Sequence, residues 1–218
     1  SSQIELRILA SLSGDASLIN DFKAGKDIHR ATASRVFDIP ENEVTALDRT
    51  RAKAVNFGVV YGMSGFGLGE SLNITRSEGQ KYINEYFAKH GAVKAYLDGL
   101  IETGEKDREV RTYYGRVRQI PEFASRKFME RELAKRLAMN TPIQGTAADI
   151  IKRAMNSVAH ELEARGLESR LILQIHDELI VEGPDSETEA VREVLDECMR
   201  GAADLVVDLI CDIHTGKT

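Results

Sequence analysis

The sequence has 218 residues, of which 42% are hydrophobic and 29% are charged, which is enough for one or two domains with a buried core. It contains no run of about 18 apolar residues and no signal peptide, which excludes a membrane-spanning helix and predicts a cytoplasmic protein. Cys198 and Cys211 do not form a C-x-x-C pair, which argues against a zinc site or a disulfide framework and fits a reducing, bacterial-type cytosol.

The net charge of −6 argues mildly against a nucleic-acid-binding protein, but the charge is unevenly distributed. Basic residues outnumber acidic ones in 111–136, and acidic residues outnumber basic ones in 178–204. The first stretch offers a surface for a polyanion. A pair of solvated helix faces would give the same pattern, so charge alone does not decide between these interpretations.

Most of the chain has helical patterning. The chain opens on 1–5 as a strand-like or loop segment, and this abrupt start suggests a piece of a longer protein. Thr45 with Asp48, and Thr75 with Glu78, predict capping boxes at two helix starts. Four glycines then break the helix that follows Thr45, and Gly166 caps a later one. The predicted helices are 27–37, 46–61, 75–89, 92–105, 125–139, 146–165 and 188–202.

Strand-forming residues occur in three places. Segment 109–120 favours strand, with Gly115 as the turn. Segments 171–175 and 179–181 flank a short polar stretch and predict a hairpin, and 205–213 predicts a final strand. Helices come first and an antiparallel sheet with covering helices follows, which indicates an α+β fold.

The polar tip of that hairpin is His176-Asp177-Glu178. Two adjacent carboxylates are costly to bury, so they require a cation or solvent. Mg²⁺ prefers one or two carboxylates together with waters and substrate phosphates, and a hairpin would present Asp177 and Glu178 rigidly to such an ion. An exposed acidic turn is the plainer alternative.

The helix after Thr45 carries Arg49, Lys53, Phe57 and Tyr61 at every fourth position. Residues four apart form one slowly drifting stripe on an α-helix. Cations at one end can hold a triphosphate, and aromatic rings can take the face of a sugar or a base. Alternatively, the rings belong to the core and the cations are solvated.

Two further groups of polar residues stand out. His29, in the segment 25–30, could donate a hydrogen bond to a phosphate oxygen, although a lone helical histidine is more often structural. Arg136, Asn140 and Gln144 are again four apart and suit contacts with phosphate, sugar or minor-groove base edges. Near Pro142, Asn140 and Gln144 could instead organise a helix junction.

Together and in this order, these motifs resemble the family A DNA polymerases of the bacterial DNA polymerase I type. The resemblance covers essentially the whole chain. Segment 2–7 (SQIELR) resembles the family's motif A, and Arg49-x3-Lys53-x3-Phe57-Gly58-x2-Tyr61-Gly62 resembles its motif B. Segment 174–179 (QIHDEL) resembles motif C. Segments 25–30 and 140–151 match two further blocks.

The resemblance implies a right-hand polymerase palm, an antiparallel sheet with helices, and a mostly helical fingers subdomain. It assigns 1–15 to the palm with part of motif A, 16–120 to the fingers, and 121–218 to the palm with the motif C hairpin. It implies a monomer that acts on primer-template DNA and dNTPs without a membrane, in replication or in repair. The implied cofactor is a pair of Mg²⁺ ions.

Roles for single residues also follow from the resemblance. Asp177 would be a ligand of the catalytic metals, with Glu178 and the backbone carbonyl of Ser1 in support. Glu5 would occupy the space that a 2′-hydroxyl needs. Tyr61 would lie beside the nascent base pair and swing as the fingers close. The remaining nucleotide contacts would come from Gln3, His29, Arg49, Lys53 and Phe57, and the DNA contacts from Arg136, Asn140, Gln144 and His176.

In the implied reaction the primer 3′-hydroxyl attacks the α-phosphorus in line and pyrophosphate leaves. Lys53 is expected to neutralise or protonate the pyrophosphate. Base pairing supplies most of the specificity, checked by closure of the fingers.

One departure from the family pattern affects the metal site. The family has an aspartate two residues before the Ser-Gln-Ile-Glu block, and that position would directly precede Ser1. Ser1 itself takes a position that is usually tyrosine. We therefore expect the chain as given to bind the metal pair poorly and to have little or no polymerase activity.

Two other interpretations stay open. A single-subunit RNA polymerase relative shares the lysine-to-tyrosine helix, but Glu5 and Phe57 lean against it. A non-catalytic DNA-binding or scaffold module gains weight from the missing aspartate.

Overall fold

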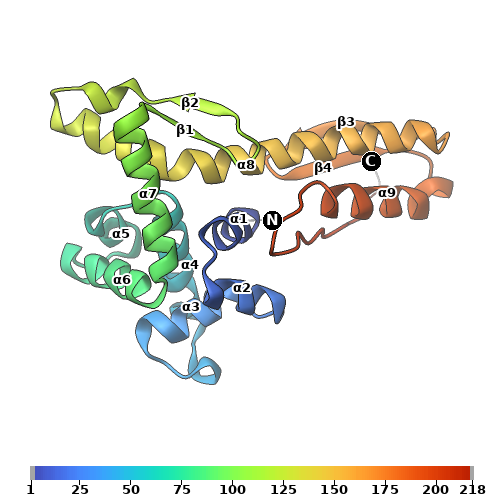
Figure 1. Ribbon diagram of the computed structural model, residues 1–218. Coiled ribbons are helices and arrows are strands. Elements are labelled where there is room, and N and C mark those ends of the chain that lie inside the picture. Colours follow the sequence, from blue (N-terminus) through green and yellow to red (C-terminus); the bar gives the residue numbers. More distant parts are fainter. Residues whose placement is uncertain (1–2, 217–218) are drawn as a thin grey trace.

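The computed structural model describes residues 3–216 and has an α+β fold that is mostly helical, with small antiparallel sheets (Figure 1). The strands are β1 (Glu109–Arg111), β2 (Val117–Gln119), β3 (Arg170–Ile175) and β4 (Glu178–Glu182). Short 3₁₀ turns are η1 (Glu41–Glu43), η2 (Pro121–Ala124) and η3 (Asp185–Glu187). The helices are α1 (Ile4–Ser13), α2 (Ala16–Lys23), α3 (Ile28–Phe37), α4 (Ala46–Val60), α5 (Gly65–Leu72), α6 (Arg76–Lys89), α7 (Gly91–Asp107), α8 (Phe128–Ala164) and α9 (Thr188–Arg200).

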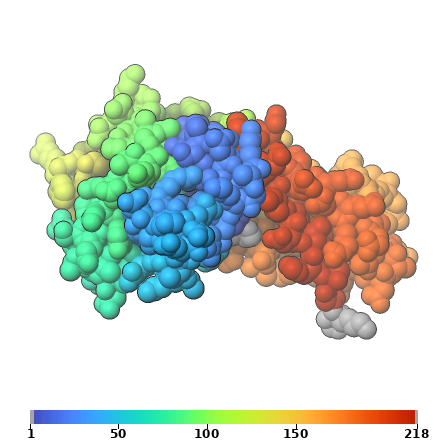
Figure 2. Space-filling view, turned by 90° about the horizontal axis from the view of Figure 1, so that it is seen from below, coloured from blue at the N-terminus to red at the C-terminus, as the bar shows by residue number. Residues whose placement is uncertain are grey.

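The long helix α8 runs along one side of the molecule and connects its two ends (Figure 1). Helix α7 rises from the cluster formed by α1 to α6 and packs on the amino-terminal half of α8, where β1 and β2 also lie. The β3–β4 hairpin and α9 pack against the carboxyl-terminal half of α8. The space-filling view shows the orange and red carboxyl-terminal elements together at one end, the blue amino-terminal elements in the middle and the green to yellow elements at the other end (Figure 2).

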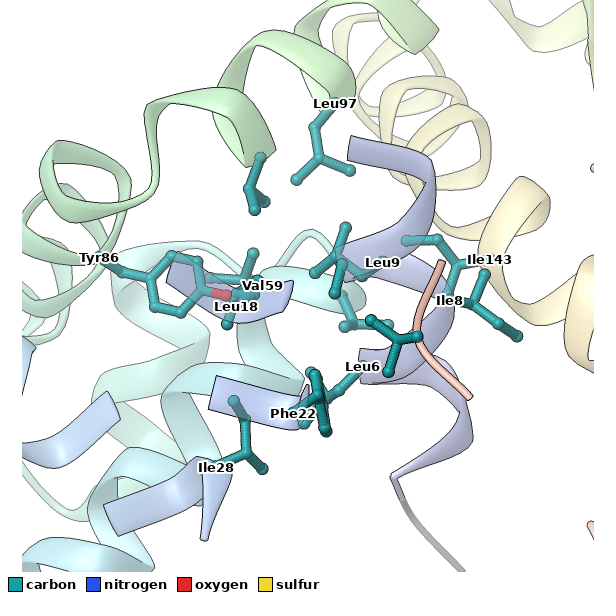
Figure 3. Close-up of a cluster of buried hydrophobic side chains, with 14 of the residues drawn as sticks. Leu6, Ile8, Leu9, Leu18, Phe22, Ile28, Val59, Tyr86, Leu97 and Ile143 are labelled. Atoms are coloured by element: carbon teal, nitrogen blue, oxygen red, sulfur yellow. The ribbon is translucent and has the colours of Figure 1, made fainter. Parts of the chain in front are cut away.

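Helix α1 lies at the centre of the main hydrophobic core (Figure 3). Its Leu6, Ile8 and Leu9 are almost fully buried. The strand-like or loop prediction for 1–5 is therefore wrong from Ile4 onward, and Ser1 and Ser2 lie outside the described residues. Alternating Ile4, Leu6 and Ile8 imitate a strand, but α2, α4, α7 and α8 all contact α1, so consecutive apolar residues are buried on several sides of one helix.

Both predicted capping boxes are present. The Thr45 hydroxyl accepts from the amide of Asp48 at the start of α4, and the Asp48 carboxylate accepts from the amide of Thr45. Thr75 and Glu78 make the same reciprocal pair at the start of α6. These contacts satisfy amide groups that a helix start leaves without partners, which is why the sequence fixes both starts.

The glycine-rich segment after α4 was predicted as a helix break, and only its first part is. Gly62 has φ of +62° and terminates α4, but Gly65, Gly67 and Gly69 lie in α5. Close packing of α5 on α6 explains them. A Cβ on Gly65 would lie 2.7 Å from the Gln80 Cβ, and one on Gly79 would lie 2.4 Å from the Gly65 carbonyl oxygen. The glycines allow two helices to approach rather than stopping one.

Helix α8 is continuous across Pro142, whereas the sequence predicted two helices, 125–139 and 146–165. Proline removes one backbone hydrogen bond and normally kinks or ends a helix. Here a stripe of buried residues runs along the whole helix, and its packing against the rest of the molecule offsets that cost. The stripe consists of Ala134, Ala138, Pro142, Thr146, Ile150, Ala154, Val158 and Leu162. The interpretation of Asn140 and Gln144 as a helix junction is wrong for the same reason.

The two predicted hairpins are confirmed, but the final strand is not. β1 pairs with β2 and β3 with β4, both antiparallel, with a register irregularity between Leu171 and Leu173. Within the described residues, segment 205–213 has no regular secondary structure. Its apolar residues are strand-like, but no described strand pairs with it, and Leu209 and Ile213 instead line a cavity. No helix within 3–216 combines the length and the apolar character needed to cross a membrane.

Candidate active site

The residues Arg49, Lys53, Phe57 and Tyr61, called the α4 row below, form one stripe along α4 and its C-cap, and none of them is among the buried residues of the helix. The Phe57 and Tyr61 rings are stacked, with centroids 6.3 Å apart and planes at 21°. Tyr61 is 40% exposed, so the interpretation of both rings as core is wrong for Tyr61. Lys53 is exposed, while Phe57 and Arg49 are half-buried. Two cations and two rings therefore share one accessible stripe, as predicted.

His29 lies beside this row, buried in α3, with its ring centroid 6.1 Å from that of Phe57. Burial and the positive charges of Arg49 and Lys53 together lower the pKa of His29 to about 4, against the opposing effect of Asp27. The imidazole is therefore neutral at physiological pH. A neutral ring can still donate one hydrogen bond to an anion.

Asp27 is a site residue that the sequence analysis did not single out. Its carboxylate caps α3 by accepting from the amides of His29 and Arg30, and it also accepts from Arg49 Nε at 2.7 Å. Burial raises the pKa of Asp27, but the hydrogen bonds from Arg49 and from the amides of His29 and Arg30 outweigh it. The pKa of Asp27 is therefore lowered. Asp27 therefore orients Arg49. An aspartate directly before a helix was the available signal, because it is a favoured N-cap.

Glu5, in the first turn of α1, joins the α4 row to the hairpin tip. Its carboxylate accepts a hydrogen bond of 3.2 Å from the Tyr61 hydroxyl. Burial raises the pKa of Glu5, the Tyr61 bond lowers it, and the negative charge of Asp177 raises it. Ile4, the residue before Glu5, lines the same cavity as Asp177, so the hairpin tip lies near the first turn of α1.

The polar stripe of α8 lies against the carboxyl-terminal end of α4. Asn140 Nδ2 donates to the Val60 carbonyl at 3.2 Å, and Gln144 hydrogen-bonds with the side chain of Tyr61. A Cβ added to Gly62 would lie 3.4 Å from Arg136 Cγ. The structure therefore gathers the predicted DNA-contacting residues of α8 around the same end of α4 that carries Tyr61.

The tip itself is a two-residue turn, His176 and Asp177, between the paired residues Ile175 and Glu178. His176 has φ of +52°, and its carbonyl accepts from Gln174 Nε2 at 2.5 Å. His176 and Glu178 are exposed and Asp177 is half-buried. This arrangement confirms the predicted hairpin with its polar residues at the tip.

A cavity of about 490 Å³ lies next to the tip, lined by Asp177, Glu178, Arg7 and the segment 209–214 among others. Neither Lys53 nor Phe57 lines it, so it is separate from the α4 row. Gln3 lies at the start of α1 and makes no side-chain capping bond there. Ser1 is outside the described residues.

The carboxylates present form only part of a metal site. Within 3–216, no group of three or more His, Cys, Asp or Glu side chains gathers in a way that could hold a metal ion. Asp177 and Glu178 are adjacent and accessible, and Mg²⁺ commonly takes one or two protein carboxylates and completes its shell with waters and phosphates. The residues therefore fit a metal ion that arrives with a phosphorylated substrate better than one held by the chain alone.

The comparison with known proteins gives the identity. The family model described as DNA polymerase family A matches residues 1–218. The chain belongs to DNA polymerase family A. It is 48% identical over 217 residues to DNA polymerase I of Geobacillus stearothermophilus, covering 100% of this chain and 25% of that protein. It is 47% identical over 217 residues to DNA polymerase I of Bacillus subtilis, with the same coverage.

A solved family A structure shows the same fold. The POL domain of Pol1 from M. smegmatis, in complex with DNA primer-template and dNTP, aligns with a TM-score of 0.91 at 43% identity. The alignment covers 96% of this chain and 37% of that one. The chain thus spans about a quarter of the length of the curated family A relatives that it matches.

Proposed function

We propose that this chain provides the fingers and the motif C part of the palm in a template-directed DNA polymerase, which transfers deoxynucleotides from dNTPs to a primer 3′-hydroxyl. One observation carries the proposal: Glu5 contacts Tyr61 of the α4 row, and its neighbour Ile4 lines the same cavity as Asp177 of the hairpin tip. The proposal places the triphosphate-binding groups of the α4 row and the carboxylates of the tip on one surface. The solved relative with bound primer-template and dNTP supports this assignment.

The incoming nucleotide would lie along the α4 row. Arg49 and Lys53 supply positive charge to the triphosphate, and His29 supplies a neutral donor beside them. The Phe57 ring packs on the sugar and base, next to Tyr61. Arg49 is held for this task by its bond to Asp27.

Glu5 would contact the sugar of the incoming nucleotide. Glu5 is half-buried and fixed by Tyr61, so a 2′-hydroxyl placed against it would meet a side chain that cannot move freely. Gln3, two residues before Glu5, is the N-cap residue at the same end of α1. Deoxynucleotides are favoured because they lack the group that Glu5 excludes.

Asp177 and Glu178 would hold two Mg²⁺ ions together with the triphosphate, with the Ser1 backbone carbonyl as a further ligand. When bound, the ions supply Lewis-acid stabilisation of the attacking oxygen and of the charge on the phosphates. The chain's own contribution to the leaving group is Lys53, whose ammonium donates a proton to, or neutralises, the pyrophosphate that departs as the primer oxygen bonds to the α-phosphorus.

The DNA would be held by Arg136, Asn140 and Gln144 of α8 and by His176 at the tip. Asn140 and Gln144 already contact Val60 and Tyr61, so a DNA strand on α8 is coupled to the end of α4. We assign 16–120 to the fingers, and 1–15 with 121–218 to the palm, of a monomeric cytoplasmic enzyme.

We propose that the metal site also needs the aspartate that the family has two residues before its Ser-Gln-Ile-Glu block. The test uses an extended polymerase, in which the family's upstream palm residues, including that aspartate, precede Ser1. We expect Mg²⁺-dependent primer extension from the extended polymerase and little from the 218-residue chain. Robust extension by the 218-residue chain would overturn the role given to the aspartate.

A second candidate function is a non-catalytic DNA-binding module. The absence of any three-donor metal cluster within 3–216 favours it. It would be preferred if the extended polymerase bound primer-template DNA but gave no Mg²⁺-dependent extension. A preference for ribonucleotides over deoxynucleotides in the same assay would instead favour an RNA polymerase.

A further inference from the structure

A buried polar chain of three residues ends at His29. Asn56 lies on the core side of α4 and is 0% exposed, yet it carries an amide. Its Nδ2 lies 3.0 Å from His29 Nδ1, and its Oδ1 lies 3.1 Å from the hydroxyl of Thr32, which is also 0% exposed. The chain Thr32–Asn56–His29 therefore links α3 to α4, and the His29 ring at its end lies 6.1 Å from that of Phe57.

The contact with Asn56 decides which ring nitrogen of His29 carries the proton. An amide NH₂ only donates, so the Nδ1 that it contacts must accept and must lack a proton. A neutral imidazole then has its proton on Nε2. Any second polar contact of His29 must therefore use Nε2 as a donor.

Thr32 holds the Asn56 amide in this orientation. The Thr32 hydroxyl lies within 2.8 Å of the Ile28 carbonyl as well as near Asn56 Oδ1. The hydroxyl has a single proton for these two acceptors. When it donates that proton to Asn56 Oδ1, it holds the amide with Nδ2 towards His29. Rotating the Asn56 amide would turn its Oδ1 towards His29 and lose this donor.

The charged neighbours of His29 explain why the tautomer matters. Asp27, Arg49 and Lys53 are the charged groups that act on His29, and two of the three are cations. A third positive charge beside Arg49 and Lys53 is disfavoured, so His29 meets a ligand as a neutral ring. A neutral ring with a bare Nε2 would present a lone pair and repel a phosphate oxygen.

We propose that Asn56 is a positioning residue which, held by Thr32, fixes His29 in the neutral tautomer with its proton on Nε2, so that His29 donates to a phosphate oxygen of the bound nucleotide. The assignment rests on the proposed function for its ligand, a nucleoside triphosphate. It rests on hydrogen-bond geometry alone for the tautomer. Asn56 itself touches no ligand and acts only through His29.

The tautomer can be read without any activity measurement. In the 218-residue chain, the ring nitrogen chemical shifts of His29 report which nitrogen carries the proton. We expect a protonated Nε2 and an unprotonated Nδ1 at neutral pH. A protonated Nδ1 would overturn the inference whether or not the chain belongs to an active polymerase.

The substitution Asn56→Asp gives the sharpest variant, because it keeps the shape and the acceptor for Thr32 but replaces a donor with a carboxylate. The carboxylate can only accept, so Nδ1 must carry the proton and the neutral tautomer reverses. In the extended polymerase we expect the KM for dNTP to rise roughly 10- to 100-fold at alkaline pH, as for loss of a hydrogen bond to a charged group. The increase in KM should be smaller at acidic pH, where His29 is doubly protonated and both ring nitrogens donate.

Matched variants separate this role from a structural one. Thr32→Ser keeps the hydroxyl and should retain the native KM, whereas Thr32→Val should raise the KM and show the same recovery at acidic pH as Asn56→Asp. Asn84→Asp, on the exposed side of α6, controls for added negative charge. His29→Gln combined with Asn56→Asp should cost no more than His29→Gln alone.

The outcomes distinguish this inference from the proposed function. An unsubstituted extended polymerase that does not extend a primer removes the nucleotide as the ligand, and the proposal with it. An active polymerase whose Asn56→Asp variant keeps its KM at every pH contradicts the positioning role alone. A variant that loses kcat equally at all pH values also contradicts it, because a tautomer effect must depend on the protonation of His29.

Discussion

The Tyr61 hydroxyl donates a 3.2 Å hydrogen bond to the Glu5 carboxylate, joining the end of α4 to the first turn of α1 across 56 positions of sequence. Tyr61 is the C-cap residue of α4, so any rotation of that helix moves the hydroxyl away from Glu5. The contact thus links the position of the α4 row to the residue proposed to read the sugar.

Replacing Glu5 by alanine in the extended polymerase should raise incorporation of ribonucleotides relative to deoxynucleotides by at least about tenfold, because the space beside the sugar would no longer be filled. Competing ribonucleotide and deoxynucleotide incorporation on one template measures this ratio. Tyr61→Phe is the companion variant, since it removes only the hydroxyl that holds Glu5, and a smaller shift in the same direction is expected. An unchanged ratio for Glu5→Ala would reject the sugar-reading role.

Lys53→Ala should slow the chemical step by roughly 10²-fold or more, as for loss of one group that stabilises developing charge. Single-turnover rates at saturating dNTP isolate that step. Lys81→Ala, an exposed lysine on α6, serves as the control and should leave the rate unchanged. If Lys53→Ala reacts at the native rate, Lys53 does not assist the departure of pyrophosphate.

Phe57→Tyr should improve the use of dideoxynucleotides relative to deoxynucleotides by at least about tenfold, because the added hydroxyl can replace a contact that the missing 3′-hydroxyl would make. Chain-termination assays with both variants of the extended polymerase give the ratio. Equal discrimination by the two enzymes would discard this role of Phe57.

Stability should fall in acid partly because of His29. Its folded-state pKa is lowered from 6.5 to about 4, so below pH 6.5 the unfolded chain binds a proton that the folded chain does not. The contribution of neutral His29 to the free energy of unfolding is fully present above pH 6.5 and is lost as the pH falls through 4. It amounts to at most about 3 kcal/mol.

Chemical denaturation of the 218-residue chain across this pH range measures how the free energy of unfolding changes with pH. The substitution His29→Gln should make this change smaller. The buried His90 has a pKa lowered chiefly by burial, so it adds a slope of the same sign that both proteins share. A His29→Gln protein with the native pH dependence would show that His29 is readily protonated in the folded state.

Asp177→Asn should abolish Mg²⁺-dependent extension by the extended polymerase, because an amide is a much poorer ligand than a carboxylate for a hard cation. Binding of primer-template DNA should persist, since the DNA contacts assigned to α8 are unchanged. Filter binding and primer extension on the same preparation separate the two effects. Retained extension would remove Asp177 from the metal site.

The parts of the fold that were predictable from sequence are those fixed by local chemistry. Thr45 with Asp48 and Thr75 with Glu78 define helix starts through reciprocal bonds that involve four residues only. The hairpin around Asp177 follows from two β-rich runs and a polar tip. The four-residue spacing of the α4 row likewise places its members on one stripe.

The mispredicted parts depend on distant neighbours. Gly65 belongs to a helix because α6 packs against it, and Pro142 lies in a helix because the buried stripe of α8 continues on both sides. Segment 205–213 has strand-like residues but no described strand beside it. Asn56 was missed at the site because its importance comes from its contact with His29, 27 positions away. A polar residue among the buried positions of α4 was the only local signal.

The central claim is that Asp177 and the α4 row bind one metal–triphosphate complex together. Paramagnetic broadening by Mn²⁺, bound with a dNTP to the extended polymerase, tests it most directly. We predict that signals of the Asp177 turn and of Lys53 and Phe57 broaden together, and that Asp177→Asn abolishes both effects. Broadening confined to one of these two elements would contradict the shared site.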